Sequence, residues 1–158
     1  MTDRAPVSQV ETELALRIAV GGGLGALARA LKLLHAHGEA NLVSVVRGGD
    51  GRAAGLLLCP NCIEGALALR REGFEVETET VVTVRTPDLP GAFAHFVATL
   101  EAENLRIAYA FSLAAGGEIL AVFRTDENPK AEDALRNYLF LPDITLPAGG
   151  EAAPPQPA

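Results

Sequence analysis

The sequence predicts an α+β protein built from two βαββαβ modules that lie side by side, with an antiparallel sheet covered by helices on one face. Each half of the chain opens with apolar residues in strand-type alternation, followed by a glycine-containing turn and a segment of helical spacing. The same order then recurs at an offset of 66 residues, where Leu16 and Ile18 align with Val82 and Val84. A repeat of this length indicates one duplicated structural unit.

The first half begins with a strand over residues 14–20, in which Leu14, Leu16, Ile18 and Val20 point to one face. Glycines 21–23 end the strand, and a helix with apolar positions Leu24, Leu27, Ala28, Leu31 and Leu34 follows, with a stop at Gly38. A hairpin is expected next, with one strand over residues 41–47 and a second strand that ends at about Cys59. A helix opened by Pro60 follows, with Ile63, Ala66, Leu67 and Arg70 on one side, and then a short strand over 74–76.

The second half repeats this order with a strand over residues 80–85 and a Pro-Gly turn before its first helix. Phe93, Phe96, Val97 and Leu100 form the apolar face of that helix. The later elements are a hairpin in which Ile107, Tyr109, Phe111 and Leu113 share one face, a return strand over 119–124, a helix from Pro129 with Ala131, Ala134, Leu135 and Tyr138 inside, and a closing strand over 144–146. Each unit therefore has the split-βαβ, ferredoxin-like arrangement.

These patterns divide the chain into four parts. Residues 1–12 are expected to form a flexible leader, residues 13–78 the first module, residues 79–146 the second module, and residues 147–158 a disordered tail rich in Pro, Gly and Ala.

Composition excludes several functional classes. The 158 residues carry a formal charge of −7 with no basic block, which argues against nucleic-acid binding. No apolar run is long enough for a membrane span, and the polar N-terminus does not resemble a secretory signal. With only Cys59 and Cys62, a reducing cytoplasm is the expected location.

Catalytic and metal chemistry find little support in the chain. Cys59 and Cys62 have no second ligand pair, so we interpret them as part of a structural turn, and His35 and His37 as residues near a helix end. No nucleophile, base and orienting group share a recognisable motif. We therefore expect a protein without enzymatic activity, metal or cofactor.

Residues 80–135 resemble an ACT domain. The residues that carry this resemblance are the turn Asp88-Leu89-Pro90-Gly91, Asn104 followed by Ile107, and the closing helix that follows Asp126 and Pro129 and carries Ala134-Leu135. The first half resembles a degenerate copy, so residues 13–146 are similar to small stand-alone double-ACT proteins. The resemblance implies regulatory binding of an amino acid or a similar small molecule between paired modules, with a regulated enzyme as a further partner. Open sheet edges favour a homodimer.

The resemblance also implies where the ligand binds, namely between the second-half turn and a strand of the other module. A helix N-terminus attracts a carboxylate, and Asp88 either caps the helix or meets a ligand ammonium. Asn41 matches the family's asparagine at the strand entry, although it also suits a turn, and Arg106 takes that place in the second half. The expected ligand-binding residues are Asp88, Leu89, Pro90, Gly91 and Ala92 in the turn, Asn41, Leu42, Val43 and Ser44 in the strand, and Gly23, Leu24 and Gly25 in the less well-formed first-half turn.

Two alternatives remain open. Gly21, Gly23 and Ala26 fit a loose dinucleotide fingerprint, but the next strand ends in Arg47 rather than an acidic residue, and the following glycine turn favours a hairpin. A structural or partner-binding module without a ligand is the rival from another class, and a large exposed apolar sheet face would favour it.

Overall fold

The computed structural model describes residues 9–21, 23–36, 42–47, 52–58 and 62–139. Within these residues the predicted succession of strands and helices is confirmed, except that the two strands expected over 74–76 and 80–85 form one. The elements are β1 (Gln9–Ala19), α1 (Leu24–Ala36), β2 (Leu42–Arg47), β3 (Ala53–Leu58), α2 (Cys62–Arg71), β4 (Val76–Pro87), α3 (Ala92–Ala102), β5 (Ile107–Ala115), β6 (Glu118–Thr125) and α4 (Asn128–Leu139).

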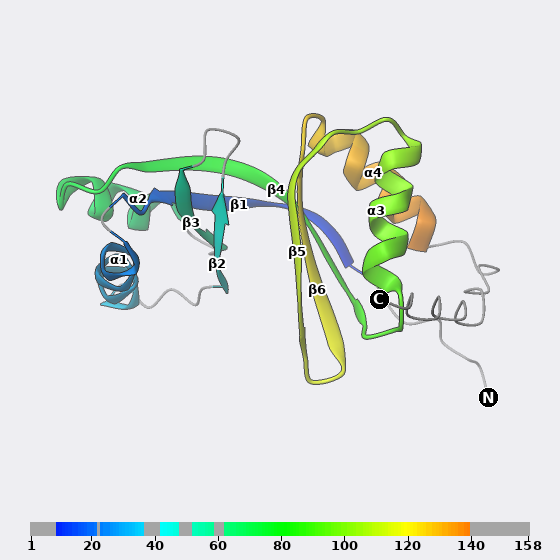
Figure 1. Cartoon of the computed structure of the whole chain (residues 1–158), viewed down its shortest axis with the longest axis horizontal. Helices are drawn as coiled ribbons and strands as arrows, with labels where there is room; N and C mark the ends of the chain where they lie inside the picture. The colour runs from blue at the N-terminus through cyan, green and yellow to red at the C-terminus, as the bar shows by residue number, and fades with distance from the viewer. Residues whose placement is uncertain (1–8, 22, 37–41, 48–51, 59–61, 140–158) are drawn as a thin grey trace, which may run out of the picture.

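The strands form one six-stranded sheet in the order β2-β3-β1-β4-β6-β5, and every neighbouring pair is antiparallel. At its centre, β1 and β4 pair from Gln9 with Arg85 to Ile18 with Val76. Figure 1 shows these two strands running from one half of the molecule into the other. Leu14 pairs with Thr80, its own equivalent at the 66-residue offset, so a pseudo-twofold axis crosses the sheet at this pair.

Each module uses part of the other module's first strand. The first module is completed by the start of β4, and the second by residues 9–12 at the start of β1, where Val10 is buried against Val82 and Val84. From the sequence we expected residues 9–12 to belong to a flexible leader. The structure instead places them in β1. The strands expected over 74–76 and 80–85 are one continuous strand, β4. The closing strand expected over 144–146 lies outside the described residues, and β1 occupies the position beside residues 82–85 of β4.

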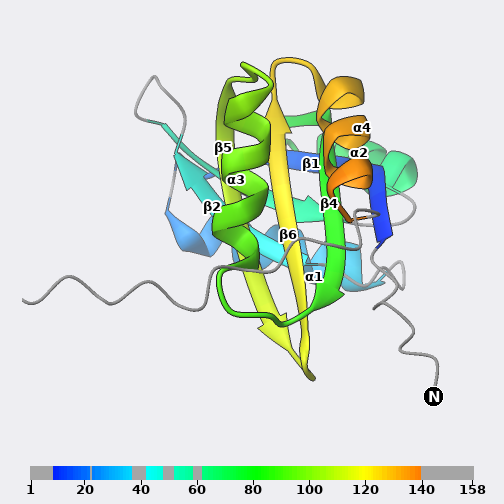
Figure 2. The same cartoon turned by 90° about the vertical axis from the view of Figure 1, so that its right-hand side faces the viewer.

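The four described helices cover the same face of the sheet, as predicted, with α1 and α2 over the first module and α3 and α4 over the second (Figures 1 and 2). Leu16 and Ile18 of β1 belong to the first core, and Val82 and Val84 of β4 belong to the second. In the second core, Phe123 meets the ring of Phe96 edge-on at 6.4 Å. The apolar alternation along the strands thus predicts the covered face correctly.

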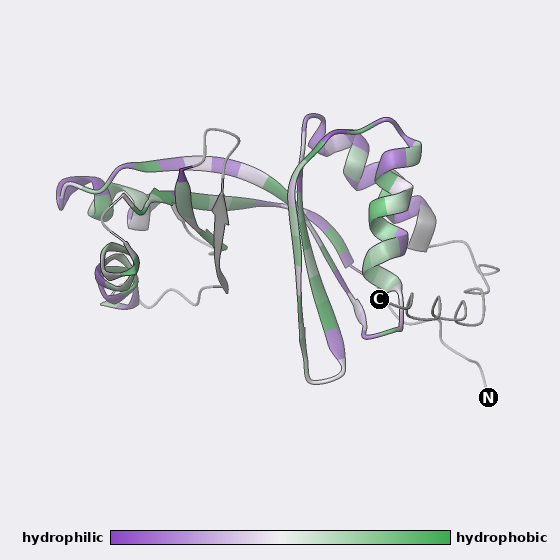
Figure 3. Cartoon of the chain, in the orientation of Figure 1, coloured by the Kyte–Doolittle hydropathy of each residue, from purple (hydrophilic) through white to green (hydrophobic). Residues whose placement is uncertain are grey.

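The opposite face of the sheet is also partly buried, although none of the described helices covers it. Ala15, Leu56, Val81 and Val122 form a third buried cluster there, together with neighbouring residues of β3 and β5. The long strands bend between the two modules, so this face is concave (Figure 1). Figure 3 shows the hydrophobic residues that run along β1 and β6. The concave face therefore encloses side chains that a flat sheet would expose to water.

Three details of side-chain direction differ from the sequence prediction. In α2, Ala66 and Leu69 are buried while Ile63 and Leu67 are exposed, so the helix is rotated away from the predicted face. In α1, Leu24 is 67% exposed and Ala30 is buried instead. A β-bulge between Ile107 and Tyr109 turns Ile107 toward the helices, whereas Tyr109 and Phe111 face the concave side.

The buried start of β1 generates a stability prediction. Val10→Ala is expected to lower the free energy of unfolding by about 1.5 kcal/mol, because two buried methyl groups contribute roughly 0.8 kcal/mol each. Urea denaturation measures this change. Glu11→Ala, at the exposed neighbouring position, is the matched control and should change the free energy by less than about 0.5 kcal/mol. Equal behaviour of the two variants would show that residues 9–12 form a leader in solution.

Candidate functional site

The turn after β4 is held by backbone hydrogen bonds. The N–H of Asp88 donates to the carbonyl of Gly117 in the β5–β6 turn at 2.9 Å, and the N–H of Ala92 donates to the carbonyl of Leu89 at 3.1 Å. Gly91 has φ of 79°, in the left-handed region where glycine is strongly favoured. The backbone of this turn is therefore well defined before any ligand binds.

The N-terminus of α3 has no side-chain cap. Gly91 occupies the N-cap position, and the first turn of the helix contains no acidic residue. The sequence left two roles open for Asp88. The structure does not show the capping role, because the Asp88 side chain is exposed and makes no capping hydrogen bond to α3. The helix N-terminus carries partial positive charge and Asp88 carries a negative charge, so this one turn offers a receptor for each end of a zwitterion.

The first-module turn follows β1 and is more open. Gly23 has φ of 87° and donates its N–H to the carbonyl of Val20 at 3.0 Å. A Cβ atom at Gly21, Gly23 or Gly25 would meet no atom within 4 Å, and Leu24 is 67% exposed. The turn exposes backbone but has no acidic side chain.

The nucleotide-binding alternative finds no support in this sheet. Both neighbours of β1 are antiparallel to it, namely β3 and β4. A dinucleotide fingerprint needs a parallel strand beside the one that precedes its glycine turn. The glycines that follow β1 therefore lack the setting in which they would bind a pyrophosphate.

The predicted strand and the predicted turn are not brought together within one chain. Leu42 of β2 pairs with Leu58, which pairs with Ala15, which pairs with Glu79 in β4. Asp88 lies nine residues beyond Glu79, roughly 30 Å along the strand direction at about 3.3 Å per residue. Asn41 lies outside the described residues. A site made from both segments would therefore need the strand of a second chain.

A charged cluster that we did not expect from the sequence lies on the concave face. We call it the Glu79 cluster: Glu79, Arg17, Tyr109 and Arg124. A carboxylate oxygen of Glu79 lies 3.0 Å from Nη1 of Arg124 and 3.9 Å from Nη1 of Arg17. The Tyr109 hydroxyl donates to the other oxygen. The one sequence feature that points to this cluster is the alternation of charged residues along β1 and β4. The same alternation is equally typical of a solvent-exposed sheet face.

Burial of Glu79 explains why this cluster gathers several donors. Its side chain is only 9% exposed, and a buried carboxylate is stable only with charged or hydrogen-bonding partners. Burial, and then the hydrogen bond to Glu79, raise the pKa of Tyr109 far above its ordinary value near 10. The phenol therefore remains a protonated donor at physiological pH.

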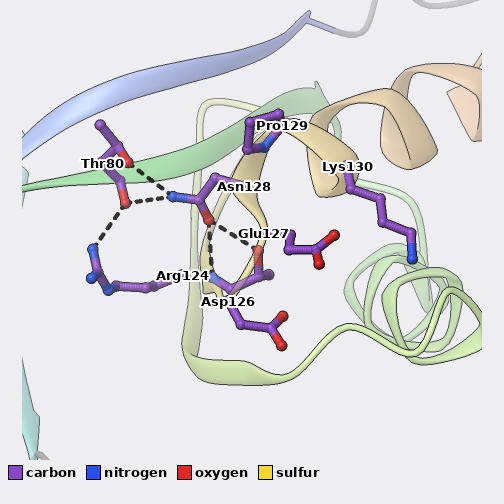
Figure 4. A pocket seen from close by; sticks show the side chains of 8 residues that line it. Thr80, Arg124, Asp126, Glu127, Asn128, Pro129 and Lys130 are labelled. Atoms are coloured by element: carbon purple, nitrogen blue, oxygen red, sulfur yellow. Dashed lines mark hydrogen bonds between the residues drawn. The ribbon is translucent and has the colours of Figure 1, made fainter.

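A hollow of about 540 Å³ lies at the start of α4 and is lined by Thr80, Arg124 and residues 125–130 (Figure 4). Its central side chain, Asn128, is 8% exposed and fully hydrogen-bonded. Its Oδ1 accepts from the N–H and hydroxyl of Thr125, both at 3.0 Å, and its Nδ2 donates to the carbonyl and hydroxyl oxygens of Thr80 at 2.7 and 3.1 Å. This network ties α4 to β4, which is a structural role.

Within the described residues, no group of three His, Cys, Asp or Glu side chains is placed to hold a metal ion. Among the described helices, none is long and apolar enough to cross a membrane.

The Tyr109 phenol generates a prediction about alkaline stability. Because its pKa is higher in the folded state than in the unfolded state, its stabilising contribution is complete below about pH 10 and is lost as pH rises above that value. One such group adds a slope of up to about 1.4 kcal/mol per pH unit. Urea denaturation between pH 8 and pH 11 should show a shallower decline for Tyr109→Phe than for the unmodified protein. Parallel declines would show that Tyr109 ionises normally.

Comparisons with known proteins agree on one family. A family model described as an ACT domain pair matches residues 12–143. No curated protein matches the chain.

Solved structures show the same fold. Protein BT0572 from Bacteroides thetaiotaomicron has a TM-score of 0.65 at 21% identity, over 83% of this chain and 90% of its own. The regulatory subunit of aspartate kinase from Thermus thermophilus has a TM-score of 0.60 at 15% identity, over 85% and 98%. Aspartate kinase from Synechocystis matches with a TM-score of 0.56 at 18% identity, over 89% of this chain but 28% of its own. These structures thus include both a separate regulatory subunit and part of a longer kinase.

Proposed function

Because the chain belongs to the ACT domain pair family, we propose that it is a regulatory protein that binds an amino acid at the turn formed by residues 88–92. The observation that carries this proposal is the uncapped N-terminus of α3 beside the exposed carboxylate of Asp88. The fold resembles regulatory subunits of aspartate kinases, which supports a regulatory role without catalysis by this chain.

An amino acid fits the chemistry of this turn. Its carboxylate is attracted by the first N–H groups of α3, which are not covered by a side chain. Its ammonium forms a charge-assisted hydrogen bond with Asp88. The left-handed Gly91 lets the ligand approach the backbone closely, since no Cβ stands in the way.

We place the facing segment, Asn41 and residues 42–44 of β2, in a second copy of the chain, because the register separates β2 from the turn within one copy. Two such sites then form by symmetry in a homodimer. β5 supports this assembly: it is an edge strand without a charged residue, and its residues 112–115 are exposed. An unprotected edge of this kind favours pairing with another strand.

The regulatory output of the proposed homodimer is control of a partner enzyme in the cytoplasm. A ligand-free partner-binding module is less well supported, because the face of the sheet without helices buries its apolar residues in the third cluster. Such a module would need a large exposed apolar face.

Asp88→Ala is expected to weaken binding of the amino acid at least about tenfold, since a hydrogen bond to a charged group contributes about 1.5–3 kcal/mol. A thermal-shift screen of the twenty amino acids, with NAD, NADP, ATP and zinc as competing classes, identifies the ligand. Calorimetry then compares the variants. Asp133→Ala, an exposed aspartate on α4, is the control and should bind normally. Unchanged affinity in Asp88→Ala would contradict the role of Asp88.

Mixing two defective chains tests whether the site is shared. Asn41→Ala and Asp88→Ala chains are each expected to bind weakly, but their heterodimer contains one intact site, with the turn from the first chain and the strand from the second. Calorimetry of a re-equilibrated equimolar mixture should therefore recover about a quarter of the binding sites, by random pairing of the chains. A mixture that behaves as the average of its components would place the whole site within one chain.

A further inference from the structure

The pseudo-twofold axis relates two glutamates on the concave face. Glu13 and Glu79 are 66 residues apart and lie on either side of the Leu14–Thr80 pair: Glu13 pairs with Val81, and Ala15 pairs with Glu79. The duplication thus places two carboxylates in equivalent backbone positions on the central strands.

The two carboxylates have different surroundings. Glu79 is bound by Arg17, Arg124 and the Tyr109 hydroxyl. In the first module, Leu58 takes the position of Arg124 at the 66-residue offset. Leu42 takes the position of Tyr109, because Leu42 pairs with Leu58 as Tyr109 pairs with Arg124. Leu58 cannot donate a hydrogen bond, so the first module lacks the guanidinium that its copy provides.

Glu13 shows the consequence of this difference. Its Oε2 is buried and has no hydrogen-bond partner among the residues that the structure describes. A buried carboxylate oxygen without a donor is unfavourable, and such atoms are rare in folded proteins. The residue as a whole is only half-buried, so its side chain borders the surface. The described part of the protein thus provides no hydrogen-bond donor for Oε2 of Glu13.

We propose that Glu13 anchors a second binding site, on the concave face, for the protonated primary amine of a small molecule. An ammonium group supplies both the missing N–H donor and the compensating charge. A metal ion fits less well, since the described residues provide no set of three ligating side chains. Asp88 lies toward the far end of β4, so this site is separate from the turn and does not rest on the proposed function.

The test uses the full chain and ethylammonium as the probe, with tetramethylammonium at equal ionic strength as the cation that lacks an N–H. Carbon NMR of the glutamate carboxylates and the thermal midpoint are followed during titration. Ethylammonium should shift the Glu13 signal saturably and raise the midpoint, and tetramethylammonium should do neither. Glu11→Gln, an exposed position on the same face of β1, is the control and should respond as the unmodified protein does. Glu13→Gln should weaken the midpoint response at least tenfold. Equal responses to both cations, or an unchanged response in Glu13→Gln, would overturn the proposal.

The thermal midpoints of two variants distinguish a binding role of Glu13 from a purely structural one. Glu13→Gln should keep or raise the thermal midpoint without probe, because it removes a carboxylate that has one buried oxygen without a donor, whereas Glu79→Gln should lower the midpoint by weakening contacts with two arginines. A fall in Glu13→Gln as large as that in Glu79→Gln would show that Oε2 has a donor within the protein and would overturn the proposal. Asp88→Ala should retain the ethylammonium response, and its loss would place the amine at the turn instead.

Discussion

The pairing of β1 with β4 is the constraint on which the rest of the structure depends. The two strands pair from Gln9–Arg85 to Ile18–Val76, and each contributes to both modules. Val10 is buried in the second core, while Leu16 and Ile18 of the same strand are buried in the first. Because neither core is complete without both strands, the two modules are one cooperative unit rather than two domains joined by a linker.

The bend of this central pair decides where charge is buried. In a flat sheet, the face opposite the helices would be solvated and its charged residues would contribute little to stability. Here that face is concave, so Glu79 is nearly buried and holds Arg124 and Tyr109 close to the module boundary. The turns that follow β1 and β4 lie at opposite ends of the sheet, because the two strands run in opposite directions.

Local patterns in the sequence predict most of the elements, the repeat and the helix-covered face, because those features follow from alternation of apolar residues. The start of β1 was missed because Val10 is the only large apolar residue among Gln9–Thr12, which is too weak an alternation to recognise. The bulge beside Tyr109 leaves no mark in residue types. Alternation also cannot tell a solvated face from a concave one, so the Glu79 cluster escaped notice. At the turn after β4, the sequence leaves the role of Asp88 open, because capping depends on the backbone at Gly91.

Divergence of the two repeats then determines which functions remain equivalent. The second-module turn has Pro90 and a backbone hydrogen bond from Asp88 to Gly117, so this turn has little conformational freedom left to lose. The first-module turn has glycines with open space around them, and ordering such a segment is entropically unfavourable. The concave face shows the reverse pattern: in the second module the carboxylate is satisfied by its own neighbours, and in the first module Glu13 is not. The duplication therefore supplies two copies of one backbone fold, and side-chain differences distinguish them. The turn with an acidic side chain, Asp88, is in the second module, and the carboxylate oxygen without a donor, Oε2 of Glu13, is in the first.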